Sequence, residues 1–155
     1  MADHQEKSPE CLHIEEIVKT KMPTSPIYAF LLTPGRISAA TTKGHVIARL
    51  PLQPCHMNSM SSLHGSVTTT IVDWMGGMAI CASSLRTSSG VSVDIHVCYQ
   101  SGAKAGDEIE IEGIVEKLGS NLAFTKVNIY KVEDEKRGRL VASGTHTKFV
   151  KGAWA

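Results

Sequence analysis

Residues 64–83 read HGSVTTTIVDWMGGMAICAS, and this stretch decides the fold. Its apolar side chains recur at helical spacing, at Val67, Ile71, Trp74, Met75, Met78 and Ala82. This spacing predicts one long helix with a continuous apolar stripe. The opposite face is made mostly of small and polar residues: Ser66, Thr69, Thr70, Asp73, Gly77 and Ile80. Gly76 and Gly77 each cost about 1 kcal/mol of helix propensity relative to alanine, so we expect another backbone to approach the helix closely there.

The segments on either side of this helix predict β-strands. Apolar and polar residues alternate from Val91 to Gln100, which puts Ser92, Asp94 and His96 together on the polar face of a long strand. Five further strands are expected over residues 36–42, 45–52, 109–117, 121–132 and 139–150. We expect a turn at Lys43-Gly44, a bulge at Gly113-Ile114 and a hairpin loop over 133–138.

The order of these elements indicates an α+β fold. A short amphipathic helix over 10–21 comes first and is ended by Pro23 and Pro26, because proline disfavours helix at the residue before it. Two strands, the long helix and four strands in a meander follow. Such segregated antiparallel strands predict a six-stranded sheet wrapped around one central helix. We divide the chain into an N-terminal helix and linker, residues 1–25, and one domain, residues 26–155.

Composition excludes several classes of protein. The 155 residues suit a single domain, and 16 Lys and Arg against 15 Asp and Glu leave a net charge of +1. Nucleic-acid binding normally needs a basic surface, so no nucleic-acid partner is expected. Apolar stretches fall far short of the roughly 20 residues of a membrane span, and the polar N-terminus resembles no signal or transit peptide. We expect a soluble cytoplasmic protein with no membrane partner.

The cysteines and histidines indicate neither a metal nor a cofactor. Cys11, Cys55, Cys81 and Cys98 match no zinc motif or compact disulfide framework, and are expected to be buried or half-buried thiols. The Cys55-His56 pair with His64 could form part of a metal site. However, no acidic or thiol partner lies nearby at a ligand-like spacing.

An ordered set of short segments resembles a known family. The segments are His56-Met57-Asn58, Leu63-His64-Gly65-Ser66-Val67, Asp73, Gly90-Val91-Ser92-Val93-Asp94, Leu122-Ala123-Phe124-Thr125 and Gly144-Thr145-His146-Thr147-Lys148. Together they resemble the hotdog-fold acyl-CoA thioesterases of the PaaI type, over roughly residues 36–148. The resemblance implies the hotdog fold and hydrolysis of an acyl-CoA or acyl-pantetheine thioester.

The resemblance also implies a role for each matching residue. Asn58 and the N–H of Gly65 would hold and polarise the thioester carbonyl, with His64 orienting Asn58. Asp73 would act as general base on the attacking water, and Ser92 would help to place that water. A helix N-terminus independently suits an oxyanion, because its free N–H groups and dipole favour negative charge.

Four further residues are candidates for substrate binding. Ser66 replaces the second glycine that is common in the family's HGG motif, and the bulky Trp74 follows Asp73. Both are expected to reshape the acyl side of the site. Lys104 and Lys148 are candidates for the phosphates of coenzyme A.

The spacing of Gly65 and Asp73 favours a homodimer with shared active sites. Eight residues of helix separate them by about 12 Å along the axis, too far for one water to serve both. An antiparallel second copy would bring Asp73 of one protomer toward Gly65 of the other. A homotetramer, as a dimer of such dimers, is the expected assembly.

Three other functions remain open. Related hotdog proteins hydrate or dehydrate acyl thioesters, but no Asp-x4-His arrangement of that kind is present. Cys98 or Cys55 could act as a nucleophile, although Cys98 lies mid-strand without a helix N-terminus or basic partner to activate it. A non-catalytic acyl-thioester or lipid-binding module would need a pocket but not Asp73.

Overall fold

The computed structural model describes residues 7–152, which form three helices and six strands. The helices are α1 (Pro9–Lys21), α2 (Pro26–Leu32) and α3 (Gly65–Ala82), with short 3-10 turns at Met22–Thr24 and Pro54–His56. The strands are β1 (Arg36–Thr41), β2 (His45–Pro51), β3 (Val91–Tyr99), β4 (Glu108–Leu118), β5 (Leu122–Glu133) and β6 (Lys136–Phe149). The predicted helices over 10–21 and 64–83 and all six strands are confirmed. The apolar patch at 27–32, too short to classify by periodicity, is helix α2.

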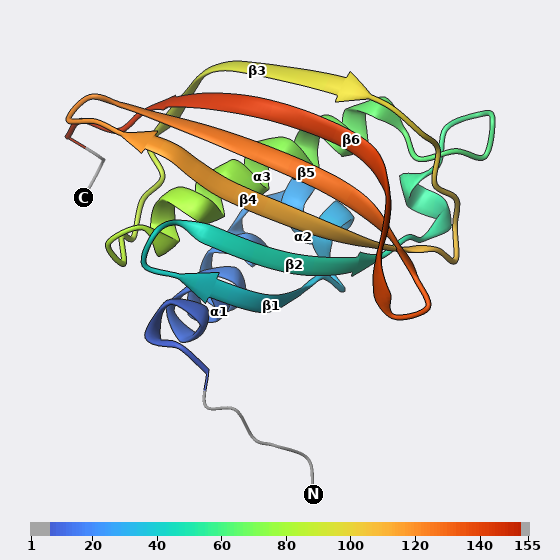
Figure 1. The fold of residues 1–155 in the computed structure, drawn as a ribbon, viewed down its shortest axis with the longest axis horizontal. Coiled ribbons are helices and arrows are strands. Elements are labelled where there is room, and N and C mark those ends of the chain that lie inside the picture. The colour runs from blue at the N-terminus through green and yellow to red at the C-terminus, as the bar shows by residue number, and fades with distance from the viewer. Residues whose placement is uncertain (1–6, 153–155) are drawn as a thin grey trace, which may run out of the picture.

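All six strands form one antiparallel sheet in the order β1-β2-β4-β5-β6-β3, which confirms the predicted α+β fold (Figure 1). The predicted meander of the last four strands is wrong, because β3 pairs with β6 at the sheet edge and not with β4. The segment after β3 instead brings the chain to the middle of the sheet, where β4 pairs with β2. Strand periodicity carries no information on which strand is the partner, so the order had to come from packing.

Two local predictions shift by a few residues. The bulge in β4 lies between Val115 and Lys117, not at Gly113-Ile114. Gly113 stays in regular pairing, and Met75 of α3 packs directly on it: a Cβ there would lie 2.6 Å from the Met75 side chain. The expected loop over 133–138 is a tight turn, because β5 and β6 pair up to Glu133 and Lys136.

The core lies between the sheet and α3. The apolar stripe of α3 is buried, as shown by Ile71 and Met75, and it meets Ile109, Ile111 and Ile129 of the sheet. Burying one such side chain contributes about 1.5–3 kcal/mol. Helix α1 adds Ile14 and Ile17 to the same core, while the domain boundary at residue 25 stays a prediction.

The glycine pair of α3 does face a close neighbour, but the neighbour is made of side chains. A Cβ on Gly76 would lie 2.8 Å from Thr125 Oγ1 and 2.9 Å from His146 Nδ1. A Cβ on Gly77 would lie 3.1 Å from Ser89 Oγ. The missing side chain at residue 76 therefore makes room for a buried histidine of β6.

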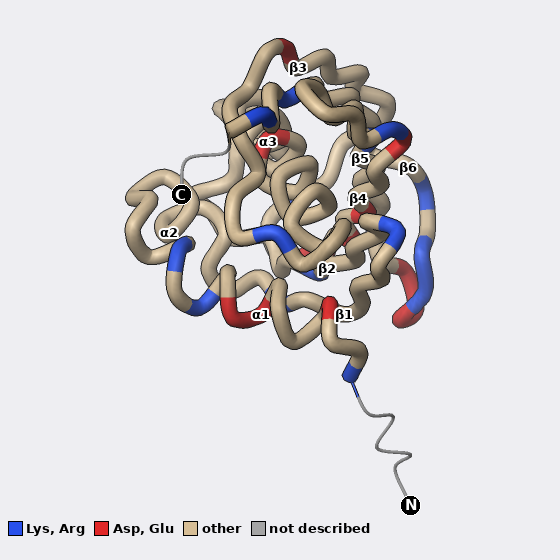
Figure 2. Tube along the Cα trace, turned by 90° about the vertical axis from the view of Figure 1, so that its left-hand side faces the viewer, with Lys and Arg blue, Asp and Glu red and all other residues tan. Residues whose placement is uncertain are grey.

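The other face of the sheet is charged. Arg49 and Arg137 form ion pairs with Glu110, and Arg137 also pairs with Glu112, at 2.8–3.3 Å. Figure 2 shows basic and acidic residues interspersed along the chain. Within residues 7–152, no helix has both the length and the apolar character to cross a membrane.

Candidate active site

The structure divides the candidate site residues into two groups along α3. Asp73 and Ser92 meet halfway along the helix, whereas Asn58, His64, Gly65 and Ser66 lie around its N-terminus. Helix α3 runs without interruption from Gly65 to Ala82, so about 12 Å of helix separates the two groups within one chain.

The first group is the carboxylate cluster: Tyr28, Asp73, Ser92 and His146. Asp73 Oδ1 accepts a hydrogen bond from Ser92 Oγ at 3.2 Å, and Oδ2 accepts one from the Tyr28 hydroxyl. His146 Nε2 lies 2.9 Å from Ser92 Oγ and 3.6 Å from Asp73 Oδ1. The side chain of Asp73 remains 28% exposed. Its carboxylate is therefore held in a fixed orientation while water can still reach it.

Ser92 joins this cluster because β3 carries a bulge. The pairing of β3 with β6 shifts register between Ser92 and Asp94. Strict alternation would place Ser92 with Asp94 and His96 on the outer face, as the sequence predicted. That prediction is wrong: the extra residue lets Ser92 face α3, on the side of Ile95 and Val97, which pack against the core.

His146 is a site residue that had no role in the sequence analysis. It is fully buried, and burial together with the nearby charge of Lys148 lowers the pKa of its imidazole, against an opposing effect of Asp73. The ring is therefore neutral at pH 7, and Nε2–H donates to Ser92 Oγ if Ser92 in turn donates to Asp73. Nδ1 is buried and has no hydrogen-bond partner among the described residues. The segment 144–148 supported the family resemblance, but nothing in the sequence connects it to Asp73.

Tyr28 is the second site residue that sequence reasoning missed. Burial, followed by the hydrogen bond to Asp73, raises the pKa of its hydroxyl far above the ordinary value, so it remains a donor. Helix α2 is fixed near the start of α3 by His56, whose Nε2–H donates to Leu31 O at 2.8 Å. The short apolar stretch around Tyr28 has no periodicity that could have indicated this role.

The second group is the helix-start cluster: Asn58, His64, Gly65 and Ser66. His64 is the N-cap of α3, and its Nδ1 accepts from Ser66 N at 3.1 Å and lies 2.8 Å from Ser66 Oγ. Because Nδ1 accepts a backbone N–H, the ring proton of neutral His64 is on Nε2. The helix itself offers no acceptor for the Gly65 N–H. The Gly65 N–H is therefore left to bind a group outside the helix, at the positive end of the helix dipole.

Asn58 is oriented by its own loop rather than by His64. Asn58 Oδ1 accepts from Met60 N at 2.9 Å and from Ser62 N at 3.1 Å. These two bonds occupy the side-chain carbonyl and leave the NH₂ group as the free donor. An NH₂ group of this kind can donate to a carbonyl oxygen.

The predicted substrate-binding residues lie in different surroundings. Trp74 is 5% exposed and lines a cavity beside Tyr28, while Ser66 lies at the exposed helix start. Lys104 is exposed beside a hollow that also includes Ser62 and Arg139. Lys148 is only 6% exposed, and burial lowers the pKa of its ammonium despite the nearby Asp73. Its position argues against contact with a phosphate.

The cysteines are two buried and two exposed free thiols, so the prediction of burial is wrong for Cys55 and Cys98. Cys98 also has a basic neighbour that the sequence did not indicate, because its Sγ lies 3.3 Å from His96 Nε2. Both nitrogens of His56 are occupied, by Gln53 N and Leu31 O. Among residues 7–152, no three His, Cys, Asp or Glu side chains are grouped to hold a metal ion.

The chain is similar to known proteins both in sequence and in structure. A family model described as "Thioesterase superfamily" matches residues 60–137. Acyl-coenzyme A thioesterase 13 of Homo sapiens is 40% identical over 115 residues, which are 74% of this chain and 79% of that protein. The crystal structure of zebrafish thioesterase superfamily member 2 superposes with a TM-score of 0.75 at 33% identity, covering 90% of this chain and 94% of its own. A hypothetical thioesterase of Streptococcus pneumoniae with coenzyme A gives 0.68 at 25% identity, covering 78% and 88%.

Proposed function

The chain belongs to the thioesterase superfamily and is an enzyme of that family, and we propose that it hydrolyses acyl-CoA thioesters with a water molecule activated by Asp73. The observation that carries this proposal is the carboxylate cluster, in which both oxygens of Asp73 are held by donors and the group remains open to water. The human relative is named an acyl-CoA thioesterase, and the pneumococcal relative was crystallised with coenzyme A.

Asp73 acts as general base. Each carboxylate oxygen has two acceptor positions, so one remains free on each after the bonds from Tyr28 and Ser92. The water proton moves to Asp73 as the water oxygen bonds to the thioester carbon. The C–S bond then breaks, and the same proton passes to the sulfur of coenzyme A. Such a base contributes about 10²–10⁴-fold to the rate. Neutral His146 orients Ser92 without adding a charge.

The helix-start cluster stabilises the oxyanion. The Gly65 N–H and the free NH₂ of Asn58 donate to the carbonyl oxygen as it becomes negative, at the positive end of the α3 dipole. Loss of one such donor costs about 3–4 kcal/mol in the transition state. His64 holds the first turn of the helix in place through Ser66.

A second copy of the chain completes the site. Strand β3 links both clusters, because Ser92 near its start bonds to Asp73 and Tyr99 at its end donates to Gly65 O at 3.1 Å. β3 is also an edge strand with exposed apolar side chains, including Val93 at 58%. Antiparallel pairing of two β3 edges would bring the Asp73 end of one copy to the Gly65 end of the other. A shared-site homodimer therefore removes the 12 Å separation, and further pairing to a homotetramer stays a prediction.

Lys104 is the better candidate for the phosphates of coenzyme A. It is exposed near the loop that holds Asn58, beside a hollow that also contains Lys131 and Arg139. Lys148 lies instead close to Asp73, whose charge raises the pKa of the Lys148 ammonium against the larger effect of burial. We therefore assign Lys148 to the surroundings of the base and not to the phosphates.

The test is hydrolysis of an acyl-CoA series by wild type and Asp73→Asn, measured as free thiol. We expect kcat to fall by about 10²–10⁴-fold with a much smaller change in KM. A non-catalytic binding module would release no thiol even as wild type. A hydratase would change an unsaturated acyl-CoA without releasing thiol. Cys98→Ser should leave the rate unchanged, and its inactivity would indicate a cysteine nucleophile instead.

Mixing subunits tests the shared site directly. Inactive Asp73→Asn and weakened Asn58→Ala chains are exchanged, and each heterodimer then contains one site with both lesions and one with neither. Activity per heterodimer should return toward half that of wild type. If mass spectrometry confirms the exchange and no activity returns, the two residues act within one chain.

A further inference from the structure

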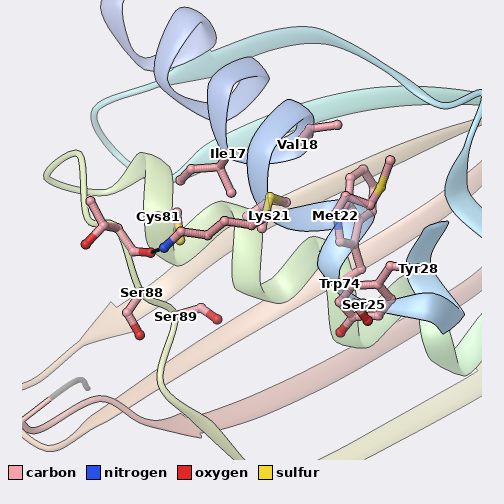
Figure 3. A pocket seen from close by; sticks show the side chains of 12 residues that line it. Ile17, Val18, Lys21, Met22, Ser25, Tyr28, Trp74, Cys81, Ser88 and Ser89 are labelled. Atoms are coloured by element: carbon pink, nitrogen blue, oxygen red, sulfur yellow. Dashed lines mark hydrogen bonds between the residues drawn. The ribbon is translucent and has the colours of Figure 1, made fainter. Parts of the chain in front are cut away.

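A cavity of about 280 Å³ lies beside the carboxylate cluster, between α1, α2, α3 and residues 87–89. Figure 3 shows its lining side chains, which come from the N-terminal helices, from α3 and from the segment that follows α3. Its apolar surface is made by Ile17, Val18, Met22, Tyr28, Trp74 and Met78. Sites that bind small apolar groups are concave and lined in this way.

The cavity is connected to the proposed reaction centre by two residues. Tyr28 contributes its ring to the cavity and its hydroxyl to Asp73. Trp74 follows Asp73 directly on α3, and it is the bulky residue that distinguished this sequence from the family pattern. A group attached to a carbonyl at Asp73 would therefore enter the cavity past the Tyr28 ring.

The end of the cavity at Lys21 is polar. Lys21, the last residue of α1, donates from its ammonium to Thr87 O, and Ser88 lies beside this bond. This bond joins α1 to the segment after α3. An apolar chain that filled the cavity would stop here, because going further would require burial against an ammonium group and serine hydroxyls.

We propose that this cavity binds the acyl chain of the substrate and limits it to about eight to ten carbons, an inference that rests on the proposed function. A methylene group fills about the volume of a water molecule, roughly 30 Å³, so 280 Å³ holds about nine. Helices α1 and α2 lie outside the residues 60–137 that match the family model. Acyl preference is thus set in part by α1 and α2, which line the cavity together with Trp74 and Met78 of α3.

The expected signature is a chain-length optimum. Burial of one methylene contributes about 0.8 kcal/mol, so kcat/KM should rise by up to about fourfold per carbon until the cavity is full. Beyond about ten carbons it should stop rising, because the added carbons stay in water or must displace Lys21.

The matched variants are Val18→Phe, which fills the cavity from α1, and Leu12→Phe, which makes the same kind of change on the same helix. Val18 lines the cavity, whereas Leu12 is 54% exposed and does not. Ser25→Phe fills the cavity from a second side, and no hydrogen bond to the α2 N-terminus is lost because the Ser25 side chain makes no cap. Thermal unfolding identifies any variant that does not fold.

We expect Val18→Phe and Ser25→Phe to lower the ratio of kcat/KM for decanoyl-CoA over butyryl-CoA by tenfold or more. Both should move the optimum to a chain two to four carbons shorter. Leu12→Phe should keep the wild-type ratio. If both cavity-filling variants fold and keep that ratio, the cavity does not hold the acyl chain.

A binding measurement separates this inference from the proposed function. The chain has two tryptophans, Trp74 and Trp154, so Trp154→Phe leaves Trp74 as the single reporter. In an Asp73→Asn, Trp154→Phe chain, Trp74 emission should respond to decanoyl-CoA at lower concentration than to butyryl-CoA. Length-dependent binding by a chain whose wild type hydrolyses no thioester would refute the function and keep the cavity. If wild type hydrolyses thioesters but Trp74 emission responds equally to both acyl-CoAs, the proposed function stands and the acyl-chain role of the cavity is refuted.

Discussion

Replacing Gly76 by alanine should destabilise the protein, although alanine is the better helix former. The added Cβ would lie 2.8 Å from Thr125 Oγ1 and 2.9 Å from His146 Nδ1, both on buried residues. Real Cβ atoms do not approach so closely, so His146 must move. That movement strains or breaks its 2.9 Å contact with Ser92 Oγ, on which the orientation of Asp73 depends.

The magnitude follows from three contributions. Helix propensity favours alanine by about 1 kcal/mol. Overpacking in a rigid core costs about 1–3 kcal/mol, and a lost hydrogen bond costs about 1 kcal/mol. The net destabilisation is about 1–3 kcal/mol, which lowers Tm by about 2–12 °C for a chain of this length. We also expect kcat to fall by about tenfold, because Ser92 loses one of its partners.

Gly77→Ala is the matched control on the next residue of the same helix. Its Cβ would lie 3.1 Å from Ser89 Oγ, a partly exposed hydroxyl that can rotate away. The propensity gain then dominates, and Tm should stay the same or rise by up to about 4 °C. Thermal unfolding at one protein concentration and kcat on a single acyl-CoA measure both variants. If Gly76→Ala is as stable and as active as Gly77→Ala, the packing of His146 against α3 is refuted.

Two further predictions concern Tyr28 and the buried histidines. Tyr28→Phe removes one donor from the Asp73 carboxylate and should lower kcat by about tenfold. The control is Tyr130→Phe, on the charged face of the sheet beside Arg137, which should leave kcat unchanged. Equal kcat values for the two variants would show that Asp73 does not need the Tyr28 hydrogen bond. Burial lowers the pKa of both His56 and His146 in the folded protein. Below about pH 6.5 the unfolded chain therefore binds more protons than the folded chain. The free energy of unfolding should then fall from pH 7.5 to 5.5, by at most about 1.4 kcal/mol per pH unit for each histidine. Urea unfolding measures this slope, which His146→Gln should reduce; a stability independent of pH over that range would contradict neutral burial.

The sequence alone determined the local elements and indicated the residues of the proposed reaction. The apolar stripe of residues 64–83 specified α3 and its buried face, because helical periodicity is a property of neighbouring residues. The alternation over residues 91–100 specified β3 in the same way. Asp73, Ser92, Asn58 and Gly65 were found because they belong to an ordered family pattern.

The tertiary structure decided which of these residues meet. His146 and Tyr28 reach Asp73 from segments far away in the chain, and no local period connects them. A bulge of one residue turned Ser92 from the outer face to the helix, which strict alternation excludes. Strand order was also decided by packing, because β3 pairs with β6 and not with β4, the next strand in the sequence. Periodicity reports the faces of single elements, whereas a site built from α2, α3, β3 and β6 depends on non-local contacts that form only when the core packs.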